Sequence, residues 1–102
     1  SSLPTLIFDE IDTGISGEAA DLTAKMLKKM SANVQIISIS HLPQIAAKAT
    51  THYFVEKSGE SETTVTQLNA EERVTAIARM LSGSTLSDAA IQNAQALLSE
   101  EN

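Results

Sequence analysis

The chain has 102 residues, enough for one small domain, and its formal net charge of −6 at pH 7 argues against a phosphate-backbone binding surface within this segment alone. It has no cysteine, which excludes a disulfide framework and a cysteine-based zinc site. Its apolar stretches are only strand-sized, so we expect a cytoplasmic protein with no signal peptide and no membrane contact.

The first half of the chain predicts a strand, a helix and a second strand. The apolar run 6–8 ends in two adjacent carboxylates, Asp9 and Glu10. After a glycine-containing turn, residues 17–30 have helical spacing, and the apolar run 34–39 predicts a parallel strand covered on both faces. We expect the helix to bury one apolar face, formed by Ala19, Thr23, Met26, Leu27 and Met30.

The second half predicts a short helix, a hairpin and two further helices. Their expected ranges are 44–48, 52–57 with 63–68, 70–82 and 87–99. Asn69 and Glu72 form a capping-box pair that starts the third helix, and Gly83 ends it. The chain has no repeat and no linker, so we expect a single α/β domain over residues 1–102, with a short, mostly parallel sheet, a hairpin and flanking helices.

Chemistry-bearing residues follow both predicted parallel strands. A right-handed crossover brings the carboxyl ends of the two strands to one edge, so Asp9, Glu10 and His41 should converge there. One acid could hold Mg²⁺, the other could orient or deprotonate an attacking water, and a neutral imidazole could contact a γ-phosphate. A solvated acidic turn and a loop histidine are the plainer interpretation of the same residues.

A phosphate-binding loop is missing from the sequence. No G-x-x-x-x-G-K-[ST] motif is present, and Gly14, Gly17, Gly59 and Gly83 do not form a phosphate cradle. We therefore expect the phosphate-binding part to lie upstream in a longer protein. The isolated segment should barely hydrolyse nucleotide.

Several motifs, in their order and spacing, resemble the ABC-type ATPases, especially the branch of the structural-maintenance-of-chromosomes (SMC) proteins. "LIFDEID" is similar to the Walker B strand, "TGISGEAA" to the D-loop and "SISHLPQIA" to the switch-histidine loop. "THYFVEK" and the ending "ARMLSG…AIQNAQALL" extend the resemblance toward a bacterial DNA-repair member of that branch. It covers nearly the whole chain, from about Leu3 to Leu98.

This resemblance implies the C-terminal half of a P-loop NTPase head, with Walker A upstream. Asp9 would be the Mg²⁺-associated acid, Glu10 the general base or water-positioning residue, and His41 the γ-phosphate contact; all three would bind the nucleotide. The D-loop would cross a head–head interface, and its residues are Thr13, Gly14, Ile15, Ser16 and Gly17. Many ABC proteins have aspartate near the end of this loop, where this chain has Ser16.

The resemblance also implies the cofactors and partners of the intact protein. The cofactors would be ATP and Mg²⁺. The partners would be the upstream half of the same head, a second head in an ATP-dependent homodimer, and DNA through the full-length protein. The expected role is double-strand break repair and recombination in the bacterial cytoplasm, near the nucleoid.

Two alternatives remain open at this stage. Asp9, Glu10 and Asp12 could form a Mg²⁺ cluster for phosphoester chemistry, as in topoisomerase-primase-like domains. The segment could instead be a non-enzymatic acidic dimerisation module that uses the Met and Leu stripe of helix 17–30. Because half of an ATPase head normally packs against its upstream half, we expect exposed sheet edges and self-association of the isolated segment.

Overall fold

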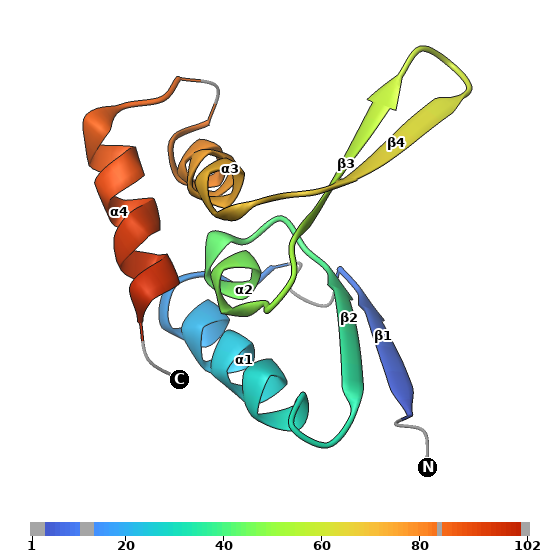
Figure 1. Cartoon of the computed structure of the whole chain (residues 1–102). Helices are drawn as coiled ribbons and strands as arrows, with labels where there is room; N and C mark the ends of the chain where they lie inside the picture. The colour runs from blue at the N-terminus through green and yellow to red at the C-terminus, as the bar shows by residue number, and fades with distance from the viewer. Residues whose placement is uncertain (1–3, 11–13, 84, 101–102) are drawn as a thin grey trace.

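The computed structural model describes residues 4–10, 14–83 and 85–100 (Figure 1). The elements in chain order are β1 (Thr5–Asp9), α1 (Gly17–Met30), β2 (Gln35–Ile39), α2 (Pro43–Lys48), β3 (Tyr53–Ser58), β4 (Glu62–Gln67), α3 (Ala70–Ser82) and α4 (Asp88–Ser99). The expected α/β fold class is confirmed, and the ranges of α1 and α3 agree with the sequence prediction. Helix α2 begins one residue earlier than expected, because proline is well suited to the first helical position.

Strands β1 and β2 form the parallel pair that the crossover argument predicts. Their register runs from Thr5 opposite Gln35 to Asp9 opposite Ile39. On one face, Phe8 and Ile36 are partly buried against the helices. The carboxyl ends of both strands therefore reach the same level at one edge of the sheet.

The opposite face of this sheet, which we call the outer sheet face, consists of Ile7, Ile37 and Ile39. These side chains are 66%, 44% and 52% exposed, respectively. The expectation that β2 is covered on both faces is therefore wrong for this chain. Helices α1 and α2 lie on one side of the two strands, and none of the described helices lies on the other (Figure 1).

Helix α2 connects two separate cores. In the first core, Ile45 packs with Ala24 and Leu27 of α1. The second core lies between α3 and α4 and contains Ile77, Ala78, Ala90 and Ala94, with Ala46 and Ala47 of α2 packed against it. A helix of only six residues is therefore held by contacts on several sides rather than by its own propensity.

Helix α1 is rotated relative to the sequence prediction. Its buried residues are Ala20, Ala24 and Leu27. Met26 is 55% exposed and Leu22 is 59% exposed, so the prediction that Met26 fills the core is wrong. Ala24 and Leu27 pack against Ile45 of α2, and this contact turns the face with Ala20, Ala24 and Leu27 inward in place of the predicted one.

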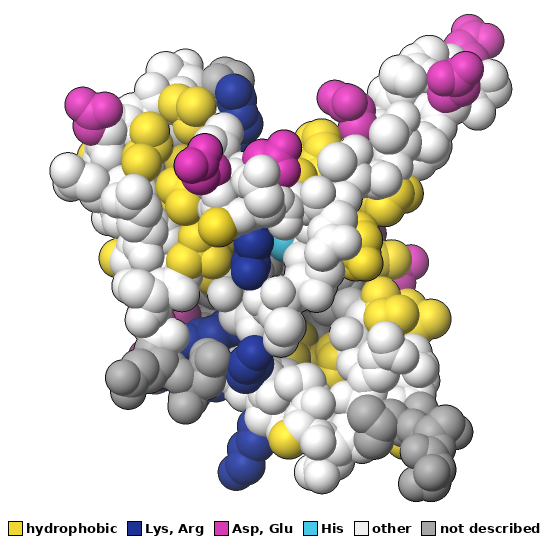
Figure 2. Space-filling model, viewed as in Figure 1, with side chains coloured by type: hydrophobic (Ala, Val, Ile, Leu, Met, Phe, Trp, Pro, Cys, Tyr) yellow, Lys and Arg dark blue, Asp and Glu magenta, His cyan; other side chains and the backbone are white. Residues whose placement is uncertain are grey.

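Strands β3 and β4 form an antiparallel hairpin that projects from the body (Figure 1). Both strands are exposed along their whole length, including Tyr53, Val55 and Val65. The hairpin forms its own two-stranded sheet and does not pair with β1 or β2. Figure 2 shows exposed apolar side chains gathered beside these strands.

The two C-terminal helices begin at well-formed caps. The Asn69 Oδ1 atom accepts from the backbone N–H of Glu72 at 2.8 Å, and Glu72 Oε1 accepts from the backbone N–H of Asn69 at 2.9 Å. The predicted capping box is confirmed. At the start of α4, Ser87 Oγ accepts from the Ala90 N–H at 3.1 Å.

Candidate functional site

The candidate site lies where β1 and β2 end. Asp9 is the last residue of β1 and stands opposite Ile39, the last residue of β2. The ladder continues for one further hydrogen bond, from the Glu10 N–H to the Ile39 carbonyl at 2.9 Å. The acidic pair and the loop that holds His41 therefore leave the sheet side by side.

Glu10 has an unusual backbone conformation. Its φ of +54° makes it the one non-glycine residue with positive φ in the described part of the chain. A side chain in the left-handed region costs about 1–2 kcal/mol. Such strain is concentrated at functional sites, so this outlier supports a functional role for the Glu10 carboxylate. Both Glu10 and Asp9 are exposed and can reach a ligand.

The loop with His41 is held at its base. The Leu42 N–H donates to Ser40 Oγ at 3.0 Å, and Pro43 then begins α2. His41 itself is exposed at the edge of the sheet. Leu42 and Ile45 anchor the following residues in the first core. The histidine thus stands between two fixed segments, β2 and α2.

The proposed D-loop lies only partly within the described residues. Thr13, like Asp12, falls outside them. Gly14 has φ +85° and Gly17 has φ +57°, so both positions favour glycine. Ser16 is the N-cap of α1 but makes no side-chain capping hydrogen bond. Gly14, Ser16 and Gly17 are exposed and Ile15 is half-buried, so most of this loop is accessible.

Two features of the region were not anticipated from sequence. Ser38 lies opposite Phe8 in the parallel strand pair. Its Oγ atom is buried and has no hydrogen-bond partner among the described residues. Arg73 of α3 donates to two carbonyls at the end of α2, although it lies 27 and 24 residues away in sequence. No local sequence signal marks a contact over that separation.

The donor set suits a magnesium ion that is shared with a nucleotide. No group of three or more potential metal ligands occurs within residues 4–10, 14–83 and 85–100. Mg²⁺ usually keeps several waters and takes one or two carboxylates together with phosphate oxygens. One exposed strand-end acid, Asp9, fits that pattern. The phosphoesterase alternative needs more acids than the described residues bring together, and Asp12 lies outside them.

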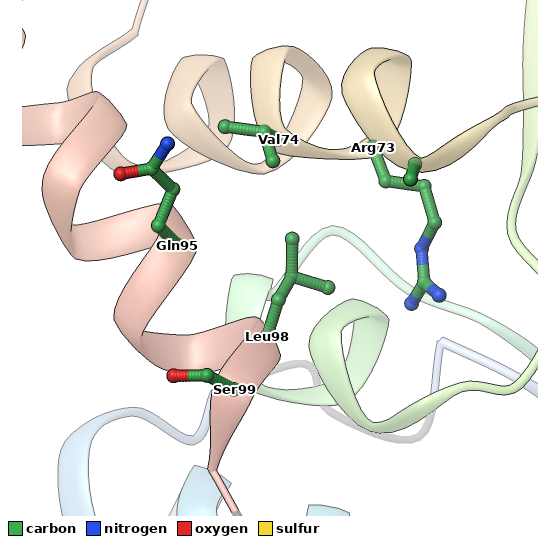
Figure 3. Close-up of a pocket in the computed structure, with 6 residues that line it drawn as sticks. Arg73, Val74, Gln95, Leu98 and Ser99 are labelled. Atoms are coloured by element: carbon green, nitrogen blue, oxygen red, sulfur yellow. The ribbon is translucent and has the colours of Figure 1, made fainter.

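A groove of about 370 Å³ lies elsewhere, between α3 and α4 (Figure 3). Its lining residues are Ala70, Arg73, Val74, Gln95, Leu98 and Ser99. Helix α2 separates these two helices from the β1–β2 pair (Figure 1), so the groove is not part of the strand-end site. In the part of the chain that the structure describes, no helix is both long and apolar enough to cross a membrane.

Comparison with solved structures identifies the class of fold. One neighbour comes from work on ATP-driven dimerization and DNA-stimulated activation of SMC ATPases. It has a TM-score of 0.68 and 22% identity, and the match covers 80% of this chain and 50% of that one. The SMC head domain of Pyrococcus yayanosii gives a TM-score of 0.67 at 23% identity and also matches 80% of this chain. The chain has the fold of SMC ATPase heads, a P-loop NTPase fold.

Curated relatives identify the family. The chain is 44% identical to the DNA repair protein RecN of Haemophilus influenzae over 96% of its length. It is 48% identical to RecN of Rickettsia conorii and 40% identical to RecN of Vibrio cholerae, each over 93% of its length. No family model matches the chain. The chain belongs to the RecN family, and it spans about 18% of the length of these relatives.

Proposed function

We propose that this segment, residues 1–102, supplies the catalytic carboxylate of an ATPase head in a RecN-type DNA-repair protein. The observation that carries the proposal is the backbone of Glu10. Its strained conformation and its hydrogen bond to Ile39 hold an exposed acid at the edge where the two parallel strands end. Ligands of open α/β sheets collect at that edge.

Each strand-end residue has a proposed role. Asp9 holds Mg²⁺ directly or through water, and the ion, when bound with ATP, neutralises charge on the phosphates. Glu10 accepts a proton from the attacking water, or orients that water. His41 donates a hydrogen bond to the γ-phosphate from the loop beside it. The D-loop residues 13–17 contact the second head across the dimer.

The upstream half of the head is the proposed partner of the outer sheet face. Parallel sheets are normally covered on both faces, but Ile7, Ile37 and Ile39 are left uncovered here. The segment also lacks a phosphate-binding loop, which that half would supply. When the upstream half covers this face, it also completes the nucleotide site. ATP turnover is therefore expected only from the intact protein.

Head dimerisation and DNA binding are proposals for the intact protein. They are supported by the DNA-repair name of the relatives and by the neighbour from a study of ATP-driven dimerization and DNA-stimulated activation. The corresponding role is repair of broken DNA at the bacterial nucleoid. ATP binding would join two heads, and hydrolysis through Glu10 would release them.

The experiment is Mg²⁺-dependent ATP turnover in the intact parent carrying Asp9→Asn or His41→Ala. Each variant should lose most of its turnover. The matched control is Glu71→Gln, which neutralises an exposed carboxylate on the first turn of α3 and should leave turnover unchanged. Unchanged turnover in both site variants would contradict the proposal.

A dimerisation module without catalysis is the second candidate. The observation in its favour is the exposure of Leu22 and Met26, which lie one helical turn apart on α1 and are 59% and 55% exposed. If this candidate is correct, substitutions on α1 should abolish assembly of the parent. Substitutions of Asp9 and His41 should then have no effect on its function.

A further inference from the structure

Arg73 of α3 connects the outer helices, α3 and α4, to α2, the helix that follows His41. Its Nη2 atom donates to the carbonyl of Ala46 at 3.0 Å and to the carbonyl of Ala49 at 2.9 Å. Figure 3 shows the side chain leaving α3 with its guanidinium beside α2. The last carbonyls of a helix have no partner within the helix, and a cation there also complements the helix dipole. Arg73 therefore caps α2 from another element.

Helix α2 needs such an anchor. It has six residues, which corresponds to a length of about 9 Å, and a helix this short is not stable by itself. Its N-cap, Leu42, makes no side-chain capping bond. Ile45 and Ala46 fix the sides of the helix in the two cores. At its C-terminal end, the Ala49 N–H donates to the Ala46 carbonyl at 3.3 Å, and the side-chain hydrogen bonds come from Arg73.

The position of α2 determines the position of His41. Pro43 begins the helix two residues after His41, and the Leu42 N–H donates to Ser40 Oγ in the short turn between β2 and α2. A shift of α2 along its axis would therefore move the histidine relative to Glu10. Misplacement of a catalytic group by about 1 Å can cost on the order of 100-fold in rate.

We propose that Arg73 is a positioning residue for ATP hydrolysis, which holds His41 at the strand edge by capping α2. This inference rests on the proposed function of the strand-end site. It adds a coupling between α3 and the site, so movement of the outer helices would change the hydrolysis rate. The hydrogen bonds of Arg73 go to Ala46 and Ala49 at the C-terminal end of α2, so its proposed effect on the strand ends passes through α2.

The test is steady-state ATP hydrolysis by the intact parent carrying Arg73→Met, which keeps the length of the side chain but removes its donors. We expect kcat to fall by about 10- to 100-fold with KM for ATP unchanged, because ATP would be held mainly by the phosphate-binding part upstream, whereas His41 must be aligned with the γ-phosphate for hydrolysis. Arg73→Lys, which keeps the charge and a donor, should have an intermediate kcat. The control is Arg79→Met, an exposed arginine on the same helix, which should be unaffected.

Wild-type kcat in Arg73→Met would overturn the proposal, and so would a loss seen in KM for ATP rather than in kcat. If Arg73→Met does not fold, Arg73→Lys decides: a reduced kcat with an unchanged KM supports the proposal, and a wild-type kcat overturns it. Glu10→Gln is assayed in parallel. Turnover that survives Glu10→Gln refutes the proposed function, whereas turnover lost in Glu10→Gln and retained in Arg73→Met refutes the positioning role alone.

Discussion

The backbone N–H of Glu10 donates to the carbonyl of Ile39 across 2.9 Å, one residue beyond the last register pair of the parallel strands. This bond fixes the residue after β1 to the end of β2, although Glu10 has left the extended conformation. Because the carbonyl belongs to the residue just before the Ser40–His41 loop, the acid and the histidine have a common backbone anchor. Movement of either strand end would displace both groups.

The first prediction concerns the capping box of α3. Replacing Asn69 by alanine removes the acceptor of the Glu72 N–H and should cost about 0.5–2 kcal/mol of stability. Equilibrium urea unfolding of the 102-residue chain measures this cost. Ser16→Ala is the matched control, since Ser16 is an N-cap without a side-chain capping bond, and it should cost less. Equal losses in the two variants would contradict this interpretation of the caps.

The second prediction concerns the outer sheet face. The isolated chain should self-associate through Ile7, Ile37 and Ile39, and Ile37→Lys should shift it toward monomer, because a charge is costly to bury in such a contact. Sedimentation velocity gives the distribution of species. Met26→Lys, at a comparably exposed position on α1, should leave the association unchanged. The reverse result would favour the dimerisation module.

The third prediction concerns His52. Burial lowers the pKa of His52 below its ordinary value of 6.5, and the nearby charge of Arg73 lowers it further. As the pH falls, the unfolded chain therefore takes up a proton at His52 at a higher pH than the folded chain does. The stability that depends on a neutral His52 should be complete above pH 6.5 and should decrease as the pH falls through the lower folded-state pKa.

NMR titration of the His52 ring measures this pKa directly. Arg73→Met removes the neighbouring charge and should raise the pKa part of the way toward 6.5, with the effect of burial remaining. Arg79→Met, which changes an exposed arginine on the same helix, should leave the titration unchanged. A midpoint at or above 6.5 in the unsubstituted chain would refute the account of this site.

Local signals in the sequence were sufficient to predict most of the elements. The Asn69–Glu72 pair and Gly83 mark the two ends of α3, and both appear in the structure as expected. The apolar run before Asp9 and the apolar run before His41 predicted two parallel strands. The structure shows this parallel pair, with Asp9 opposite Ile39. These features depend on neighbours in sequence, so a single chain contains the information.

Features that depend on tertiary packing could not be predicted in the same way. Helical spacing on α1 predicted an inward stripe that includes Met26, whereas packing buried Ala20 and Ala24 and left Met26 exposed. The apolar run of β2 suggested two covered faces because such runs usually come from complete sheets, whereas Ile37 and Ile39 have no cover here. The Arg73 bonds to α2 likewise join residues with no sequence pattern between them.

The central claim is that Glu10 is the catalytic carboxylate of an ATPase head. The most direct measurement is ATP turnover of the intact parent carrying Glu10→Gln, with the mass of the head dimer determined in the presence of ATP. We predict that turnover falls by about 100- to 10,000-fold, as for loss of a general base, and that an ATP-bound dimer accumulates. Turnover close to that of the unsubstituted parent would contradict the account and leave the acidic strand end as scaffold.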